Sequence, residues 1–370
     1  MPIFDVLFYT FIVVVFIQII YYLFIFGKFS FHKKQEQPPK NIPVSVIICA
    51  KNEAKSLKKF LPSILEQDYP NFEVVLINDG STDKTLKVME AFKKDFNNIK
   101  IVDVKNIEAF WGNKKYALTL GIKASTHNVL LFTDADCKPI SNQWIKEMSS
   151  HFTNSKSIVL GYGAYEKIKG SFLNKLIRFE TLLTAVQYFS YAEMGQPYMA
   201  VGRNLAYRKE LFFEASGFIN HMRIKSGDDD LFVNQNATAE NTAICFSKDS
   251  FTESIPEQTL STWIDQKRRH ISTAKFYKFS HKALLSLFYI TQLLFWILAI
   301  LLISTLTFWQ IVVGLVFVRF LVEFISLGYA SKKLNESDVI PFLPVLEVFL
   351  ISMQFFIFIK NLISRPKNWK

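Results

Sequence analysis

Long apolar runs occur at both ends of the chain, and a mixed pattern lies between them. Residues 6–26 form one unbroken apolar run, and further runs follow from about residue 282. A helix of about 20 apolar residues can cross the roughly 30 Å hydrocarbon core of a bilayer. Between these ends, short β-branched runs alternate with segments whose apolar residues recur at helical spacing. The pattern predicts a water-soluble domain held between membrane-embedded ends.

The first apolar run is expected to be a retained membrane anchor. A cleaved signal peptide carries positive charge before its apolar stretch and small residues after it. Here Asp5 precedes the run and the segment GKFSFHKK follows it. Basic residues flank membrane helices mainly on the cytoplasmic side. Lys28, Lys33 and Lys34 therefore predict a multi-pass protein of the cell membrane whose following domain faces the cytoplasm.

The C-terminal runs predict a transmembrane hairpin followed by a third segment. The hairpin comprises runs 283–303 and 308–330, and Arg319 and Glu323 lie four residues apart in its second helix. This spacing favours an ion pair inside a helix bundle. The third run, 339–359, is interrupted by two prolines and two polar residues. A full crossing would place the basic tail KNLISRPKNWK outside, whereas a re-entrant or interfacial path would keep it inside, and the sequence leaves both open.

The middle of the chain alternates strands and helices. Strand-like runs occupy 43–50, 72–79, 99–104 and 128–134, and helical segments lie between them. Alternation at this spacing predicts an α/β fold built on a doubly wound sheet, parallel or mixed, with one N-terminal and two to three C-terminal membrane helices. The expected domains are an N-terminal anchor at 1–28, a cytoplasmic domain at 41–280 and a C-terminal membrane region at 282–362.

Composition narrows the classes of partner. The 370 residues are 50% hydrophobic and 15% aromatic, too apolar for an ordinary soluble enzyme, and carry a net charge of +11. The basic residues are scattered rather than gathered in the dense arm of a nucleic-acid-binding protein, so a membrane surface and phosphate groups are expected instead of nucleic acid. Cys49, Cys137 and Cys245 lack CxxC spacing, which indicates buried free thiols in a reducing compartment and no zinc site.

Polar residues at the ends of the predicted strands form a candidate ligand site, because ligands bind beyond the carboxyl ends of strands in such sheets. Asn52 and Glu53 follow the first strand, and Asp79 ends the second. Asp134 and Asp136 end the fourth strand, one residue apart. Such a pair either caps a turn or holds Mg²⁺ or Mn²⁺, which prefers oxygen ligands and completes its shell with water and substrate phosphate. The first turn has neither GxGxxG nor a P-loop pattern, which argues against a dinucleotide or P-loop site.

Six motifs carry a family resemblance. In chain order they are VSVIICAKNE, VVLINDGSTD, GNKKYAL, LLFTDADCKP, SGDDDLF and QKRRH. Their order and spacing over residues 43–275 resemble those of the family 2 glycosyltransferases, inverting enzymes of GT-A fold that include cellulose, chitin and hyaluronan synthases. The apolar ends make the chain similar to the membrane-bound branch of that family.

The resemblance implies a donor site and a metal site. Asp134 and Asp136 would hold the donor and Mg²⁺ or Mn²⁺, with Asp136 the firmer ligand. Structural alternatives are helix capping by Asn52, an Asx turn at Asp79 and a solvated helix-face position for Lys114. The donor-binding residues that the resemblance implies are Asn52, Glu53, Asp79, Lys114, Asp134 and Arg269.

An inverting transfer also needs a general base for the acceptor hydroxyl. With Leu231 as the register mark, Asp228 aligns with the aspartate of the family's Glu-Asp pair, and Gly227 stands where the first acid usually does. Asp229 and Asp230 stay open as alternatives. Adjacent carboxylates raise one another's pKa, which suits a base near neutrality. The structural alternative is a solvated acidic helix start.

The last motif and a short apolar turn imply acceptor contacts. QKRRH resembles Q-x-x-R-W, in which Gln266 would border the acceptor channel and Arg269 would face the diphosphate. His270 replaces the tryptophan that commonly forms an acceptor platform in polymer-extending relatives, which argues against processive synthesis. Arg203, beside Asn204, resembles a family element near donor and acceptor.

One helical stripe lies between the metal and base motifs. It predicts either core packing or an interfacial helix that admits an amphiphilic acceptor. Its residues are Phe172, Leu176, Phe179, Leu183 and Val186.

Together these features predict an inverting, metal-dependent glycosyltransferase of hexosyl or N-acetylhexosaminyl type. It would move a sugar from a nucleotide-diphosphate sugar, with a UDP-sugar favoured, to a lipid or lipid-linked acceptor. The alternatives are a processive polysaccharide synthase and a catalytically inactive membrane scaffold of the same fold. The scaffold alternative predicts loss of the metal acids or the base, and both are present.

Overall fold

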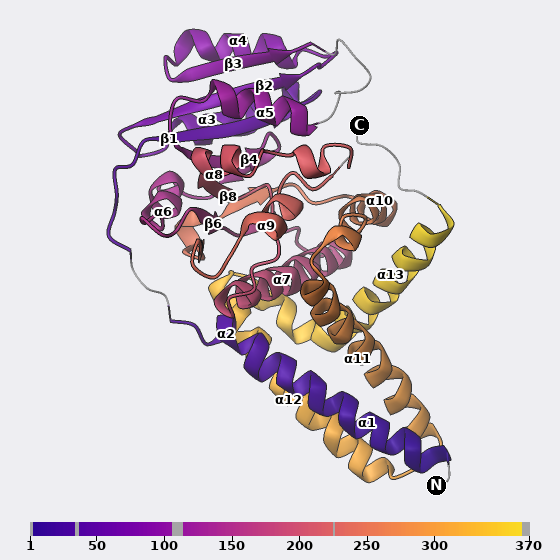
Figure 1. The fold of residues 1–370 in the computed structure, drawn as a ribbon. Helices are drawn as coiled ribbons and strands as arrows, with labels where there is room; N and C mark the ends of the chain where they lie inside the picture. The colour runs from indigo at the N-terminus through magenta and orange to yellow at the C-terminus, as the bar shows by residue number, and fades with distance from the viewer. Residues whose placement is uncertain (1–2, 34–36, 106–113, 225, 365–370) are drawn as a thin grey trace.

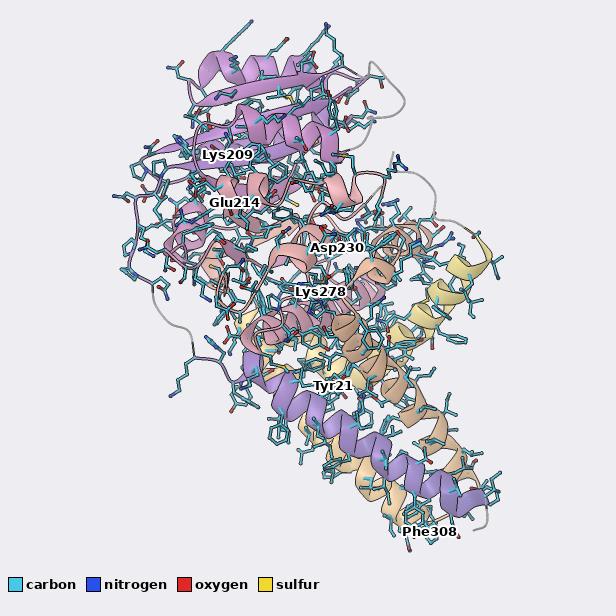
Figure 2. All side chains as sticks on the ribbon, viewed as in Figure 1. Tyr21, Lys209, Glu214, Asp230, Lys278 and Phe308 are labelled. Atoms are coloured by element: carbon cyan, nitrogen blue, oxygen red, sulfur yellow. The ribbon has the colours of Figure 1, made fainter. Side chains whose placement is uncertain are left out.

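A computed structural model describes residues 3–33, 37–105, 114–224 and 226–364 (Figure 1). An α/β domain lies at one end of the molecule and a bundle of apolar helices at the other. Figure 2 shows Asp230 and Lys278 in the half of the domain nearer the bundle, and Phe308 at the far tip of the bundle.

A seven-stranded sheet forms the centre of the domain, in the order β3-β2-β1-β4-β8-β6-β9. Strands β1 to β4 are parallel, whereas β8 pairs antiparallel with both β4 and β6. The sheet is therefore mixed, which confirms the expected fold class. The strands are β1 (Val44–Ala50), β2 (Phe72–Asp79), β3 (Ile99–Val104), β4 (Val129–Asp134), β6 (Ile158–Leu160), β8 (Leu205–Arg208) and β9 (Thr242–Ile244). A smaller sheet has the order β5 (Cys137–Pro139), β10 (Thr252–Ser254), β7 (Gly163–Tyr165).

Helices cover both faces of the large sheet. Successive strand residues point to opposite faces, so Val46 and Ile48 join one core while Ile47 joins the other. The first face packs on α3 (Ala54–Leu65), α4 (Thr85–Asp95) and α6 (Trp144–Ser150). The second packs on α5 (Lys114–Ala124) and α7 (Phe172–Glu193). Burial on both faces explains the continuous apolar runs of the parallel strands.

Among the described residues, four helices are long and apolar enough to cross a membrane, one near the N-terminus and three near the C-terminus. The first combines α1 (Ile3–Ile20), a π-helical turn (Tyr21–Ile25) and α2 (Gly27–Ser30). It lies beside α11 (Phe279–Ser304) and α12 (Trp309–Lys333) in a three-helix bundle (Figure 1). The fourth begins with the short 3-10 helix η5 (Ser337–Phe342) and continues as α13 (Leu343–Ile363), which diverges from the bundle.

A buried polar cluster joins the apolar helices. Arg319 and Glu323 form the expected ion pair, and both are fully buried. The guanidinium of Arg319 also donates to Glu347 of α13 at 2.9 Å. Gln292 of α11 donates to Glu347 at 2.7 Å, and Tyr22 donates to Glu323 at 2.8 Å. The cluster thus connects the N-terminal helix, α11, α12 and α13.

Loss of Arg319 is expected to destabilise the helical region strongly. Arg319→Leu would leave Glu323 and Glu347 buried without their cation, and removal of one partner from a buried pair typically costs about 3 to 5 kcal/mol. Thermal unfolding in detergent should show a markedly lower Tm. Lys332→Leu, an exposed change in the same helix, is the control. Equal Tm values for the two variants would contradict this expectation.

The stripe on α7 packs mainly as core. Leu176, Phe179, Leu183 and Val186 are buried, while Phe172 is 41% exposed and contacts the ring of Phe349 in α13. Helix α7 contacts α2, α12 and α13, so it forms the base of the domain over the apolar helices. The remaining helices of the domain are α8 (Lys209–Glu214), α9 (Asp230–Asn236) and α10 (Leu260–Ile271).

Candidate active site

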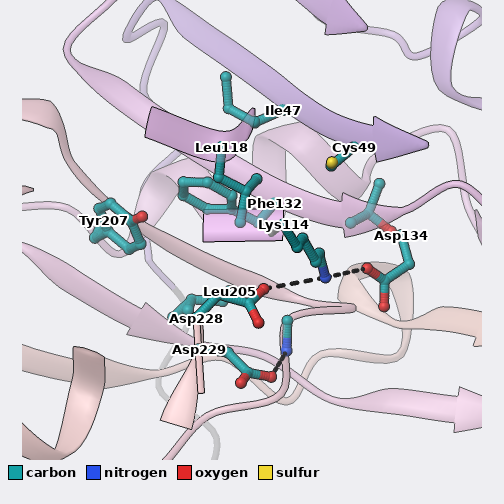
Figure 3. Close-up of a pocket in the computed structure, with 12 residues that line it drawn as sticks. Ile47, Cys49, Lys114, Leu118, Phe132, Asp134, Leu205, Tyr207, Asp228 and Asp229 are labelled. Atoms are coloured by element: carbon teal, nitrogen blue, oxygen red, sulfur yellow. Dashed lines mark hydrogen bonds and ion pairs between the residues drawn. The ribbon is translucent and has the colours of Figure 1, made fainter. Parts of the chain in front are cut away.

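A pocket opens at the carboxyl ends of β1 and β4, where the strand order of the sheet reverses. Open α/β sheets bind ligands at such a switch point. Lys114, Asp134, Asp228 and Asp229 line its polar side, and Phe132 lies among its apolar walls (Figure 3). With Ile47 and Cys49 of β1 also in its lining, the pocket brings together residues from four of the six motifs.

Lys114, at the start of α5, occupies the centre of this pocket. Its ammonium lies 3.0 Å from Asp134 and 3.0 Å from Asp228 (Figure 3). Burial disfavours its charge, but the ion pairs with Asp134 and Asp228 raise the pKa of Lys114 well above its ordinary value. The lysine is thus a permanent cation that joins the strand-end acid to the acidic triplet.

Asp134, Asp136 and Cys137 form the cluster best suited to a metal ion. One potential ligand atom from each lies within 4.8 Å of the others. Asp136 is exposed and lies outside the lining of the pocket, and partial loss of solvation together with repulsion from Asp134 raises its pKa to about 6. A divalent cation would relieve this repulsion, and the two carboxylates are the hard oxygen ligands that Mg²⁺ and Mn²⁺ prefer. Burial raises the pKa of the Cys137 thiol, so it offers no thiolate.

The three carboxylates of the acidic triplet have different surroundings. Asp228 pairs with Lys114, which holds its pKa below the ordinary value despite burial. Asp229 faces the pocket, and burial together with repulsion from Asp228 and Asp230 raises its pKa to about 7. Asp230 is buried and accepts hydrogen bonds from Thr273 and Tyr277 in the segment after α10. The first two carboxylates face the pocket, and the third anchors the fold.

Backbone geometry before the triplet leaves no place for a side chain. Gly227 has φ +92°, and a Cβ there would lie 2.6 Å from the side chain of Leu231. An acidic residue at position 227 would be strained and would collide with the start of α9. Asp228 and Asp229 are therefore the only adjacent acids that face the pocket in this described loop.

Comparison with known proteins agrees with this geometry. Residues 45–222 match the family model described as glycosyl transferase family 2. This part of the chain is therefore a glycosyl transferase family 2 domain. The mixed sheet, terminal apolar helices and strand-end acids of the chain are the features expected of a membrane-bound member, so the predicted family is confirmed.

Curated relatives match over part of their length. The chain is 35% identical over 121 residues to poly-β-1,6-N-acetyl-D-glucosamine synthase of Staphylococcus epidermidis, covering 32% of this chain and 28% of the relative. It is 30% identical over 116 residues to 4,4'-diaponeurosporenoate glycosyltransferase of Staphylococcus aureus, covering 30% of this chain and 29% of the relative. The matched segments thus span less than a third of either relative.

A solved structure shares the fold over most of the chain. The mannosyltransferase PcManGT from Pyrobaculum calidifontis, in complex with GDP-Man and Mn²⁺, superposes with a TM-score of 0.59 at 17% identity. The match covers 90% of this chain and 99% of that chain. At this identity the likeness establishes the GT-A fold of the family 2 domain.

The residues expected at the nucleotide lie at the rim of the family 2 domain. The side-chain oxygen of Asn52 accepts from the backbone N–H groups of Thr82 at 2.8 Å and Asp83 at 3.3 Å, so it caps the loop after β2. Glu53 starts α3 and accepts from Ser56. Asp79 is 3% exposed, and burial raises its pKa. The neighbouring Asn78 side-chain oxygen accepts from the Ser81 N–H, three residues on, at 3.3 Å.

Arg203 is engaged with the smaller sheet. Its guanidinium donates to the Gly163 carbonyl at 2.8 Å and the Ser254 hydroxyl at 2.6 Å, and lies 4.1 Å from the centroid of the Tyr165 ring. Its positive charge opposes the rise in the pKa of Asp136. These contacts favour a role in supporting the strands around Asp134 and Asp136.

The residues of QKRRH lie on α10, outside the lining of the pocket. Gln266 and Arg269 are half-buried, and Arg268 is 4% exposed. Lys267 pairs with Glu180 of α7 at 2.5 Å. Gln266 and Arg269, the two residues expected to contact substrate, therefore lie on a helix that borders α7. Between them, Lys267 binds α7 and Arg268 binds α13.

Sequence reasoning missed Lys115, the neighbour of Lys114. Its buried ammonium donates to the carbonyl oxygens of His221 at 2.8 Å, Ile224 at 2.9 Å and Ser226 at 2.8 Å. Burial lowers the pKa of Lys115 to about 8. The lysine holds the loop that leads into the acidic triplet, a role that its place in a helical motif does not indicate.

Proposed function

We propose that this protein is an inverting, metal-dependent glycosyltransferase of hexosyl or N-acetylhexosaminyl type. It transfers a sugar from a nucleotide-diphosphate sugar, with a UDP-sugar favoured, to a lipid or lipid-linked acceptor at the membrane. The observation that carries the proposal is the Lys114 ammonium, 3.0 Å from both Asp134 and Asp228. This ammonium lies between Asp134 and the acidic triplet, which supports a donor side and an acceptor side in one pocket.

The donor side of the pocket supports a leaving diphosphate. Asp134 and Asp136 would hold the divalent cation, which when bound neutralises charge that develops on the diphosphate. Lys114 supplies a fixed positive charge within reach of the same groups. Arg269 stays a candidate for a diphosphate contact, because a planar guanidinium matches phosphate oxygens. We keep Asn52, Glu53 and Asp79 as candidate contacts for the nucleotide of the donor.

The opposite side of the pocket supports proton removal. We assign the general base to Asp229 rather than Asp228, because Asp228 is paired with a cation and Asp229 has a pKa near 7. One oxygen of Asp229 accepts from the Gly202 N–H at 2.6 Å and the other from the Asp230 N–H at 2.7 Å. These bonds orient the carboxylate, and each oxygen keeps a lone pair for an acceptor hydroxyl. The proton leaves the acceptor oxygen as that oxygen attacks the anomeric carbon.

The apolar helices support an acceptor presented at the membrane. They lie directly beneath α7, and α7 forms the base of the catalytic domain. An enzyme that acts on a soluble sugar has no need of this placement. The positive flank of the first helix supports a cytoplasmic position for the domain.

One assay tests the proposal. The purified protein in detergent, given a panel of nucleotide sugars and a membrane lipid extract, should release nucleoside diphosphate from one of them, and EDTA should stop the release. Metal-independent release would refute the mechanism. The length of the product separates single transfer from processive synthesis. The relative in S. epidermidis is named as a poly-β-1,6-N-acetyl-D-glucosamine synthase.

A further inference from the structure

The path of α13 differs from what its hydropathy indicates. The helix has 21 residues, and about 1.5 Å of rise per residue makes it roughly 30 Å long, enough to cross a bilayer. A crossing helix has its two ends on opposite sides of the membrane. The contacts at the two ends of α13 indicate whether these ends lie on the same side of the membrane or on opposite sides.

Ion pairs attach the N-terminal end of α13 to the catalytic domain. Arg178 of α7 donates to Glu336 at 2.8 Å and to Asp338 at 2.8 Å, immediately before and within η5. Arg178 is 2% exposed and Glu336 is 1% exposed, so this ion pair is buried. The ammonium of Lys175 lies 4.1 Å from the ring centroid of Phe342, the last residue before α13.

Hydrogen bonds attach the C-terminal end of α13 to the same domain. Arg268 of α10 donates to the Asn361 side chain at 2.8 Å, and to the carbonyl of Ser364 at 2.7 Å and its hydroxyl at 2.8 Å. A buried arginine at the end of a helix satisfies carbonyl groups that have no partner within the helix. Helices α7 and α10 are themselves joined by the pair Lys267–Glu180.

The middle of α13 contacts the bundle, and its outer face is apolar. Glu347 accepts from Gln292 at 2.7 Å and from the Trp296 indole at 3.3 Å. Further along, Phe355, Phe356 and Phe358 are exposed, a surface suited to lipid. Figure 1 shows α13 leaving the bundle and running up toward α10.

We propose that α13 is a re-entrant helix whose two ends lie on the side of the catalytic domain, and that Arg268 is a positioning residue which attaches its end to α10. The path of the helix is independent of the enzymatic activity. The role of Arg268 rests on the proposed function, because it acts through the helix that carries Gln266 and Arg269.

Labelling of single cysteines in the full chain tests the path. Lys370→Cys at the last residue of the sequence should react with a membrane-impermeant maleimide only after the cells are permeabilised, as should Lys58→Cys on the exposed face of α3. Thr305→Cys, in the turn between α11 and α12, should react in intact cells. The unaltered chain, with Cys49, Cys137 and Cys245, gives the background. Labelling of Lys370→Cys in intact cells would overturn the re-entrant path.

Kinetics test the role of Arg268. Arg268→Gln should lower kcat/KM about tenfold, with a lower kcat and a higher KM for the donor, because the displaced α10 carries Gln266 of the proposed acceptor side and Arg269 of the proposed diphosphate contact. Arg268→Lys, which keeps the charge, should recover part of the rate. Such recovery would show that the loss in Arg268→Gln does not come from misfolding. Arg208→Gln, at the end of β8, is the control. A lower Tm with unchanged kcat would overturn the positioning role. Inactivity of the unaltered enzyme would refute the proposed function and leave the labelling result intact.

Discussion

The Asp229→Asn variant is expected to bind the nucleotide sugar normally and to transfer the sugar about 10³-fold more slowly, within the usual range for loss of a general base. The amide cannot take the acceptor proton. Donor affinity, measured by calorimetry with the metal present, should be nearly unchanged, because Asp229 is proposed to face the acceptor and not the donor. Single-turnover measurements should assign the loss to the transfer step.

The neighbouring acids provide matched controls. Asp228→Asn removes one of the two ion pairs of Lys114, so it should mainly weaken donor binding. Asp230→Asn weakens the buried attachment to Thr273 and Tyr277, so it should lower the Tm. If Asp228→Asn abolishes transfer while Asp229→Asn does not, the base is Asp228, as the register to Leu231 predicts.

The pH profile gives the same assignment by a second route. A general base acts in its deprotonated form, so kcat/KM should fall about tenfold per pH unit below the pKa of Asp229, which lies at about 7, and level off above it. The pKa of Asp136 is about 6, so its protonation could also lower kcat/KM at acidic pH. Saturating metal prevents this second decrease. The limb near pH 7 should be absent from the residual activity of Asp229→Asn.

Replacement of Asp136 by alanine is expected to abolish transfer, with a loss of about 10³-fold or more at any concentration of Mg²⁺ or Mn²⁺. The reason is electrostatic, because a metal with one fewer carboxylate ligand is held weakly and the diphosphate leaves without its counter-charge. Nucleoside diphosphate release, followed as Mn²⁺ is titrated, is the direct measurement.

The control for this variant is Asp249→Ala, an exposed carboxylate outside the pocket, which should keep full activity and the same Mn²⁺ dependence. EDTA should reduce the unaltered enzyme to the level of Asp136→Ala, and Mn²⁺ should restore only the former. Equal turnover of Asp136→Ala and the unaltered enzyme would show that these acids only cap a turn.

Local patterns were sufficient to predict the four parallel strands of the sheet and to single out Asp134 and Asp136. The apolar runs and their helical partners predict strands β1 to β4, because burial on both faces forces a continuous apolar sequence. Asp134 and Asp136 stand out because charge at the end of such a strand needs a partner. The antiparallel strand β8 and the short β6 and β9 were not predicted, since strands of three or four residues carry too little periodicity.

Individual site roles depend on neighbours that are distant in the chain. Lys114 and Lys115 are equivalent in a motif, yet a difference of one helical position points the first at Asp134 and Asp228 and the second at the loop before the triplet. Likewise, Asp228, Asp229 and Asp230 differ in protonation only because a lysine, a backbone N–H and two hydroxyl groups approach them from other elements.

The amino-acid pattern alone specified the alternation of the α/β domain, the apolar ends and the acids at the strand end, because these follow from burial and from short-range periodicity. The three-dimensional arrangement was needed to distinguish the acids of the triplet and to trace α13. Hydropathy measures how long and how apolar a helix is, whereas its path depends on what holds its ends. For α13 these are Arg178 and Arg268, and both belong to the catalytic domain.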